Sequence, residues 1–286
     1  SNIYIGIDVG STTVKVVVMD IEKDKILWDD YQRHEARQQE KVLELIQLVE
    51  KQVPEIEIGK SRVFVTGSGG NDVAKYLGAK FVQEVNAVAL AAEKHFPDVG
   101  SVIELGGQDS KIIIFKENIG GRKKKIPSMN DKCAGGTGAV LDKINAKLRI
   151  PAEDLCKHGY NGIKIHHIAG KCGVFAESDI NSLQKLGVPN SELMASLFDA
   201  IVLQNLTILT RGHTLRPQVL LLGGPNTFIK GLQQAWKFHL QVMWEERKVK
   251  LPEGVPLEEL IIVPENALYF AVLGAIEYGK EEPRSE

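Results

Sequence analysis

The first candidate site for chemistry is a glycine-rich turn near the start of the chain. In IGIDVGSTTVK, Asp8 ends an apolar run and Gly10 permits backbone angles that other residues avoid. The residues that follow offer hydroxyls and backbone N–H groups to phosphate oxygens, namely Ser11, Thr12 and Thr13. Lys15 can reach the same anion. A single turn of this kind is also an ordinary hairpin connection, so it indicates phosphate binding only if other turns support it.

A second turn, ELGGQDSK, repeats the pattern later in the chain. Gly106 and Gly107 have no side chains and so leave the backbone open to a ligand, while Gln108 and Asp109 present an amide and a carboxylate. These groups suit a bound water or a hydrated Mg²⁺ ion. Lys111 completes a GGQDxK pattern and is a further candidate contact for the nucleotide.

A third turn, LLGGPN, ends another apolar run. Gly223 and Gly224, followed by Pro225, leave space for a flat ring to approach the backbone. Three such turns are what a nucleotide lying in a cleft between two subdomains would require. The sequence has neither a Walker loop nor a Rossmann fingerprint opening a helix in the right context.

Two cysteines share an unusual setting. Cys133 stands in NDKCAGGTG and Cys172 in GKCGVFAESD, each before a predicted helix. A thiolate at a helix N-terminus is stabilised by the helix dipole, which suits it to bind a metal. The alternative is that both are small buried apolar residues. A closed zinc site within one chain lacks ligands, whereas two chains about a two-fold axis would supply four thiolates, which suits a [4Fe–4S] cluster.

Several other residues are weaker candidates for a functional role. Cys156, in EDLCKHG, lacks the glycine-rich setting and is expected to be an unpaired thiol in the core or on the surface. His166 and His167 adjoin a strand-like run and are expected to be structural. Glu177 and Asp179 flank the second cysteine helix at its N-terminal side. The basic run Arg122–Lys125 is predicted to be a solvated turn.

Apolar periodicity places these residues on an α/β framework. In the first half it predicts a three-stranded meander, a helix, a strand and a helix, at residues 3–9, 13–19, 25–34, 41–53, 62–67 and 72–78. After Pro97 it predicts strands at 101–107 and 111–117 and then helices at 133–148, 172–186 and 192–212. A strand at 218–224, a helix at 228–236, a charged connection at 245–264 and a closing helix at 267–279 follow. The repeated strand–turn–strand pattern predicts a duplicated α/β domain, with residues 1–97 plus 264–286 in one subdomain and 98–263 in the other.

Composition excludes several classes of protein. The 286 residues include 35 Lys and Arg against 37 Asp and Glu, a formal charge of −2, which argues against nucleic-acid capture as the main function. No apolar stretch approaches a membrane span and no signal peptide is recognisable, so we expect a cytoplasmic protein with no membrane partner. Three cysteines are too few for a disulfide framework.

The order DxGSTTxK, GGQDxK and GGP(N) resembles the actin-like ATPase superfamily of actin, hexokinase and Hsp70. The resemblance implies a duplicated, ribonuclease H-like fold with ATP or ADP in an interdomain cleft. It further implies that Asp8 and Asp109, with Gln108, flank Mg²⁺ and the attacking water, and that Lys15 and the hydroxyls of the first turn contact the terminal phosphates. Gly223 and Gly224 would contact the adenosine.

The segments NDKCAGGTG and CGVFAES resemble the activators of 2-hydroxyacyl-CoA dehydratases and the ATPase subunits of benzoyl-CoA reductases. This resemblance implies a homodimer that holds one [4Fe–4S] cluster through Cys133 and Cys172, with Gly135 and Gly136 near the nucleotide. ATP hydrolysis would drive one electron onto a partner iron–sulfur enzyme, and a ferredoxin or flavodoxin would be the donor. Glu104 stands where the family usually has Asp, and Gly136 where Ala is common.

A coupling mechanism follows as a hypothesis. Each cysteine would cap a helix whose far end lies toward the nucleotide, so that nucleotide binding would change the helix angle and the exposure of the cluster. Two other functions stay open. One is a small-molecule kinase such as an N-acetylhexosamine kinase, with Asp109 as base and incidental cysteines; the other is a non-catalytic partner-binding module.

Overall fold

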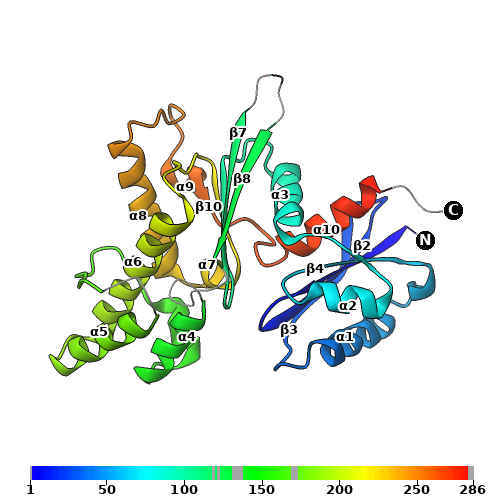
Figure 1. Cartoon of the computed structure of the whole chain (residues 1–286), viewed down its shortest axis with the longest axis horizontal. Coiled ribbons are helices and arrows are strands. Elements are labelled where there is room, and N and C mark those ends of the chain that lie inside the picture. Colours follow the sequence, from blue (N-terminus) through cyan, green and yellow to red (C-terminus); the bar gives the residue numbers. More distant parts are fainter. Residues whose placement is uncertain (1, 118–119, 121–122, 131–137, 169–172, 283–286) are drawn as a thin grey trace. The chain divides into compact units, whose positions relative to one another are not determined.

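The computed structural model describes residues 2–117, 120, 123–130, 138–168 and 173–282 (Figure 1). Contacts divide the chain into two compact units. Unit 1 comprises residues 1–97 and 269–286, and unit 2 comprises residues 98–268.

Unit 1 is built on a five-stranded sheet of order β3-β2-β1-β4-β5. Its first three strands form the predicted antiparallel meander, whereas β4 and β5 run parallel to β1. The elements are β1 (Ile3–Val9), β2 (Thr13–Asp20), β3 (Lys25–Arg33), α1 (Gln38–Gln52), β4 (Arg62–Thr66), α2 (Gly70–Leu77), β5 (Lys80–Phe81), α3 (Glu84–His95) and α10 (Phe270–Glu281).

Both faces of this sheet are covered. Ile5 and Ile7 of β1 pack with the apolar face of α1, which follows from the alternation of side chains along a strand. Gly6, between them, faces the other way, where an added Cβ would lie 2.6 Å from the side chain of Val272 on α10. The nearly continuous apolar composition of β1 and β2 therefore reflects burial on two sides.

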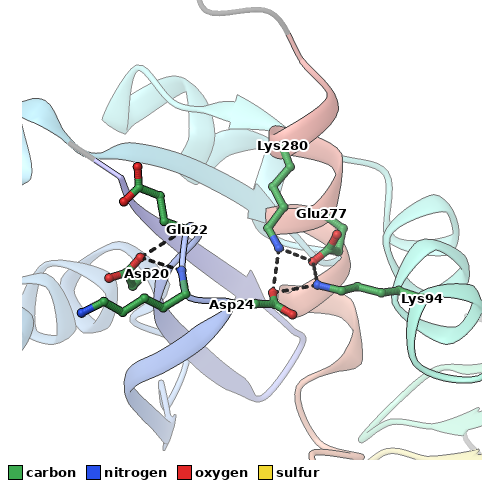
Figure 2. Close-up of polar contacts among 7 residues, drawn as sticks. Asp20, Glu22, Asp24, Lys94, Glu277 and Lys280 are labelled. Carbon is green, nitrogen blue, oxygen red and sulfur yellow. Dashed lines mark hydrogen bonds and ion pairs between the residues drawn. The ribbon is translucent and has the colours of Figure 1, made fainter.

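An ion-pair cluster joins three segments at the edge of unit 1 (Figure 2). Asp24, in the β2–β3 turn, accepts hydrogen bonds from Lys94 of α3 at 2.8 Å and from Lys280 of α10 at 2.9 Å. Glu277 of α10 accepts from the same two lysines at 2.6 and 2.8 Å. The cluster ties the turn to the two helices that pack against one another.

Unit 2 contains a second five-stranded sheet, of order β10-β9-β6-β7-β8. Its elements are β6 (Ser101–Leu105), β7 (Ser110–Glu117), β8 (Lys123–Asn130), α4 (Gly138–Lys147), α5 (Gly173–Lys185), α6 (Asn190–Leu209), β9 (Val219–Leu222), α7 (Gly224–Phe228), α8 (Lys230–Glu246), α9 (Leu257–Leu260) and β10 (Ile261–Ile262). Within the described part of the chain, α6 is the one helix long and apolar enough to cross a membrane, and 67% of that window is buried inside the protein. Such burial is typical of a core helix.

The two sheets repeat one topology. In each, the first strand of the unit is central, with two antiparallel strands on one side and two parallel strands on the other. The duplicated α/β fold predicted from the repeated strand–turn–strand pattern is confirmed.

Several elements differ from the sequence-based predictions. The described part of the predicted basic run is not a turn, because Lys123, Lys124 and Lys125 begin β8 and pair with the end of β7, while Arg122 lies outside the described residues. The connection at 245–264 contains a helix and a strand, β10, that pairs with β9. Besides β8, the elements that were not predicted are the strands β5 and β10 and the helices α3, α7 and α9. A two-residue strand carries too little periodicity to be read, and the alanine-rich α3 lacks a contrast between polar and apolar faces.

Candidate functional site

In unit 1, the first glycine-rich turn connects β1 to β2. The strand register places Asp8 opposite Lys15, and the Lys15 ammonium lies 4.0 Å from Oδ2 of Asp8. Asp8 is only 7% exposed, whereas Ser11 and Thr13 are half-buried and Thr12 is exposed. The turn is closed by the Gly10 N–H, which donates to the Thr13 carbonyl at 2.8 Å. These predicted residues therefore share one end of the sheet.

Two residues that were not identified from the sequence form hydrogen bonds with the backbone of this turn. His34 is 3% exposed and its Nε2 lies 2.9 Å from the Gly10 carbonyl oxygen. Gln38, at the start of α1, donates to the same oxygen at 3.3 Å. The backbone N–H of His34 also donates to the Thr12 carbonyl at 3.1 Å. Both lie beyond the first turn in sequence. The pairing of β2 with β3 brings His34 there, since it follows the end of β3, and Gln38 lies at the start of the next helix, α1.

The end of β4 completes the same corner of unit 1. Thr66 pairs with Asp8 in the parallel register, and its buried Oγ1 has no hydrogen-bond partner among the described residues. Gly67 follows with φ +97°, and an added Cβ there would lie 2.5 Å from Oδ1 of Asp8. Gly67 thus resembles Gly223, which also has a positive φ and a close backbone neighbour, whereas Gly10 has no positive φ and an added Cβ there would lie 3.4 Å from the Thr13 carbonyl oxygen. The glycine that ends RVFVTG was the signal that could have identified this turn.

In unit 2, the second turn connects β6 to β7 and centres on a buried lysine. Lys111 is 1% exposed, and its Nζ lies 2.8 Å from Glu104 Oε1 and 3.1 Å from Asp109 Oδ2. The Gly106 N–H donates to the Asp109 carbonyl at 2.9 Å, which tightens the turn. Gln108 is exposed at its tip. Lys111 is thus placed to orient the Asp109 carboxylate.

The third turn adjoins the second within unit 2. Gly223 has φ +89°, and an added Cβ would collide with the Leu105 carbonyl at the end of β6. Gly224 has open space around it, with no atom within 4 Å of an added Cβ. Asn226, fully buried, donates to the carbonyls of Ile103 and Leu222 at 3.2 and 3.0 Å and so fixes the turn to both strands.

The N-terminal end of α4 rests on the second turn. The N–H groups of Gly138 and Ala139 donate to the carbonyls of Gly106 and Gly107 at 2.9 and 2.8 Å. A Cβ on Gly138 would lie 3.1 Å from Pro225 Cγ, so the helix start, the second turn and the third turn converge. The hypothesis expects the far end of this helix to lie toward the predicted nucleotide turns, whereas the end that contacts them is the one nearest Cys133 in sequence.

The helices that follow the two cysteine segments are tied together by Glu177. Its carboxylate on α5 lies 2.9 Å from Lys143 Nζ and 3.0 Å from Lys147 Nζ, both on α4. Hydrogen bonds from these two lysines lower the pKa of Glu177. Glu177 was expected to flank the start of α5, and the structure gives it this additional interhelical role.

The predicted metal ligands Cys133 and Cys172, with Gly135 and Gly136, lie outside the described residues. Within the described ranges, no group of three or more His, Cys, Asp or Glu side chains is arranged to hold a metal ion. Cys156 is an exposed free thiol whose Sγ donates to the Glu153 carbonyl at 3.1 Å. His166 Nε2 lies 2.9 Å from Glu192 Oε1 of α6, which agrees with a structural role.

Comparison with known proteins identifies a matching family, related sequences and similar solved structures. Residues 5–250 match the model of the BadF/BadG/BcrA/BcrD ATPase family. The (R)-2-hydroxyglutaryl-CoA dehydratase activating ATPase of Acidaminococcus fermentans is 29% identical over 225 residues, covering 77% of this chain and 82% of that protein. The crystal structure of component A of the A. fermentans (R)-2-hydroxyglutaryl-CoA dehydratase matches with a TM-score of 0.75 and 26% identity, over 97% of each chain.

A more distant match identifies the fold alone. MreB 5 of Spiroplasma citri, solved with bound AMPPNP, gives a TM-score of 0.50 at 12% identity, over 98% of this chain and 96% of that one. Together with the repeated sheet topology, these matches show the actin-like ATPase fold.

Proposed function

The chain belongs to the BadF/BadG/BcrA/BcrD ATPase family, and from this we propose that it is an ATP-dependent activator. It would hydrolyse ATP to drive single electrons from a [4Fe–4S] cluster onto a partner iron–sulfur enzyme of the 2-hydroxyacyl-CoA dehydratase or benzoyl-CoA reductase type. The observation that carries the proposal is the family match over residues 5–250, which includes both cysteine segments. The named activating ATPase among its relatives supports the choice of partner.

The nucleotide part of the proposal rests on the chemistry of the three turns. Backbone N–H groups and hydroxyls of Ser11, Thr12 and Thr13, with the Lys15 ammonium, would bind the terminal phosphates of ATP or ADP. The open space at Gly224 fits a flat ring near the backbone, and the unpartnered Oγ1 of Thr66 fits a polar ligand or water beside Asp8. These features support a nucleotide site on this chain.

Hydrolysis would depend on the two turn carboxylates. Asp8 and Asp109, with Gln108, would orient the attacking water and the waters of a Mg²⁺ ion. When bound, the ion would neutralise charge on the phosphates. Lys111 would fix the direction of the Asp109 carboxylate, because its buried ammonium donates to that carboxylate. The products are ADP and inorganic phosphate.

The cluster part of the proposal rests on donor chemistry. Cys133 and Cys172 would be thiolate ligands, and α5 begins at Gly173, immediately after Cys172. A helix N-terminus at that point favours an anionic thiolate. Two chains about a two-fold axis would supply four thiolates and form a homodimer around one cluster. When bound, the cluster would supply a one-electron carrier, recharged by a ferredoxin or flavodoxin.

A series of contacts from the second turn through α4 to α5 supports coupling between nucleotide binding and the cluster. The second turn accepts hydrogen bonds from the start of α4, and Lys143 and Lys147 of α4 bind Glu177 of α5. A change of the Gly106–Gly107 backbone on nucleotide binding would therefore move α4, and through Glu177 the start of α5. That end of α5 adjoins Cys172 in sequence.

Anaerobic iron and sulfide analysis tests the cluster. The wild-type protein should carry about two irons and two sulfides per chain, since a [4Fe–4S] cluster would be shared by two chains. Cys133→Ser and Cys172→Ser should each lose the iron, whereas the matched control Cys156→Ser should retain it. A colourless, iron-free protein with intact ATP turnover would contradict the electron-transfer function.

The reduction potential tests the coupling. The potential should differ between the ADP-bound protein and the protein bound to a non-hydrolysable ATP analogue. The reason is that movement of α4 and α5 on nucleotide binding would change the surroundings of the cluster. Identical reduction potentials in both states would contradict the proposed coupling between ATP hydrolysis and electron transfer.

A further inference from the structure

We propose that a basic patch at one end of the unit 2 sheet binds a carboxylate-rich surface of a partner protein. The patch consists of six side chains from β7, β8, the segment after α6 and the end of α8, namely Lys116, Lys124, Arg211, His213, Arg216 and Arg247. The inference does not depend on a bound cluster or nucleotide.

The patch brings like charges together across two strands. Lys116 of β7 and Lys124 of β8 are directly opposite in the antiparallel register, so their side chains leave the same face of the sheet. Both are exposed. Lys116 Nζ also lies 3.5 Å from His213 Nδ1, which brings the segment after α6 to the same place.

Arginines extend the patch along that segment. Arg216 Nη1 donates to the carbonyl of Phe115, the residue before Lys116, at 2.9 Å. Arg247, at the end of α8, donates to Thr214 Oγ1 at 2.9 Å, beside His213. Arg211, two residues before His213, is exposed. The hydrogen bonds that fix these cations go to uncharged oxygens or a histidine nitrogen.

Among the described residues, no carboxylate forms an ion pair with any member of the patch. Elsewhere in the chain lysines are commonly neutralised in this way, as Lys94 and Lys280 are by Asp24 and Glu277. The nearest strand carboxylate, Glu117, pairs in register with Lys123 and therefore leaves the opposite face from Lys116. The patch is thus a local excess of positive charge in a chain of net charge −2.

Fold stability does not account for this arrangement. Like charges directly opposite on neighbouring strands destabilise a sheet, and an acidic residue at either position would stabilise it. An unneutralised cationic surface is what an acidic partner requires, since complementary charge speeds docking and fixes its orientation.

The partner is inferred to be a protein rather than a nucleic acid. The patch contains no Phe, Tyr or Trp on which bases could stack. The patch is also distinct from the nucleotide turn of this unit. It lies six residues along β7 from Ser110, which is about 20 Å in an extended strand.

Fluorescence anisotropy of the full chain with a labelled ten-residue polyglutamate peptide tests the proposal. The wild type should bind the peptide with an affinity that falls as salt rises, and Lys116→Glu/Lys124→Glu should weaken binding at least about tenfold. The matched control Lys51→Glu/Lys75→Glu makes the same change of net charge at exposed positions on α1 and α2. The control should retain binding within about twofold.

A single variant separates binding from stability. Lys124→Glu creates an opposite-charge pair with Lys116, so its Tm should equal or exceed that of the wild type while peptide binding falls. Equal peptide affinity for the wild type and the double variant, or equal loss in the control, would overturn the proposal. Preferential patch-dependent binding of an oligothymidylate would overturn the assignment of a protein partner.

Discussion

The ammonium of Lys111 lies 2.8 Å from the Glu104 carboxylate, on the strand directly opposite it. The same ammonium binds Asp109 at 3.1 Å, so one buried cation holds two carboxylates at the end of the β6–β7 hairpin. Removing the cation would deprive two half-buried carboxylates of their shared partner. The ion pair between Lys111 and Asp109 therefore fixes the direction of the Asp109 side chain.

Lys111→Met should cost about 2–4 kcal/mol of unfolding free energy, because it removes the buried cation that neutralises two half-buried carboxylates. Urea denaturation measures the loss, and ATP turnover should fall with it. Lys116→Met on the same strand removes an exposed lysine and should change stability by no more than about 0.5 kcal/mol. Equal stability of the two variants would show that Lys111 does not neutralise Glu104 and Asp109.

Gly223→Ala and Gly224→Ala should behave oppositely. Gly223 has a positive φ, and a Cβ would collide with the Leu105 carbonyl, so we expect a loss of at least about 2 kcal/mol. Gly224 has open space, so its variant should fold with a stability within about 1 kcal/mol of the wild type. If the space admits the adenine ring, Gly224→Ala should nevertheless weaken ATP binding, as titration calorimetry would show. Unchanged ATP affinity would exclude close approach of the ring at this position.

His34→Ala should destabilise unit 1 and weaken ATP binding together. The Gly10 carbonyl would keep only the longer bond from Gln38, and an under-satisfied buried group costs about 1–3 kcal/mol. The expected signs are a lower urea midpoint and a higher KM for ATP. His167→Ala, at an exposed position, is the control and should alter neither quantity.

Glu177→Gln should loosen the link between α4 and α5. The pKa of Glu177 is lowered by hydrogen bonds from Lys143 and Lys147, so its contribution is present above the ordinary glutamate pKa and is lost as pH falls below it. Near neutral pH the variant should reduce the difference in cluster potential between the ADP and ATP-analogue states. An unaltered difference would exclude Glu177 from the coupling route.

Asp24→Asn should weaken the ion-pair cluster shown in Figure 2. Hydrogen bonds from Lys94 and then Lys280 lower the pKa of Asp24 to about 2, from an ordinary value of 3.8. The stabilisation is therefore present at neutral pH and is lost as pH falls from about 4 to 2. Because the side chain is 53% exposed, we expect only about 0.5–1 kcal/mol at pH 7. Urea midpoints measured against pH should converge with the wild type near pH 2, and Glu22→Gln should match the wild type throughout.

Much of the framework was readable because local signals agreed with the tertiary structure. The β1–β2–β3 meander and the strands before the three glycine turns are β-branched runs bounded by turn residues. The edge strand β8 was misread because Lys123–Lys125 has the composition of a solvated turn, yet its backbone pairs with β7. Edge strands tolerate such charge, since one side of the strand has no neighbouring strand to pair with.

The sequence by itself determined the repeated topology, the three turns and the cysteine segments, because glycine spacing and apolar alternation are properties of neighbours along the chain. Only the tertiary structure decided which distant groups support them. His34 meets Gly10 through the pairing of β2 with β3, Thr66 meets Asp8 through β4, and Glu177 meets α4 through helix packing. Such contacts depend on how strands and helices stack in space, which spacing along one segment does not encode.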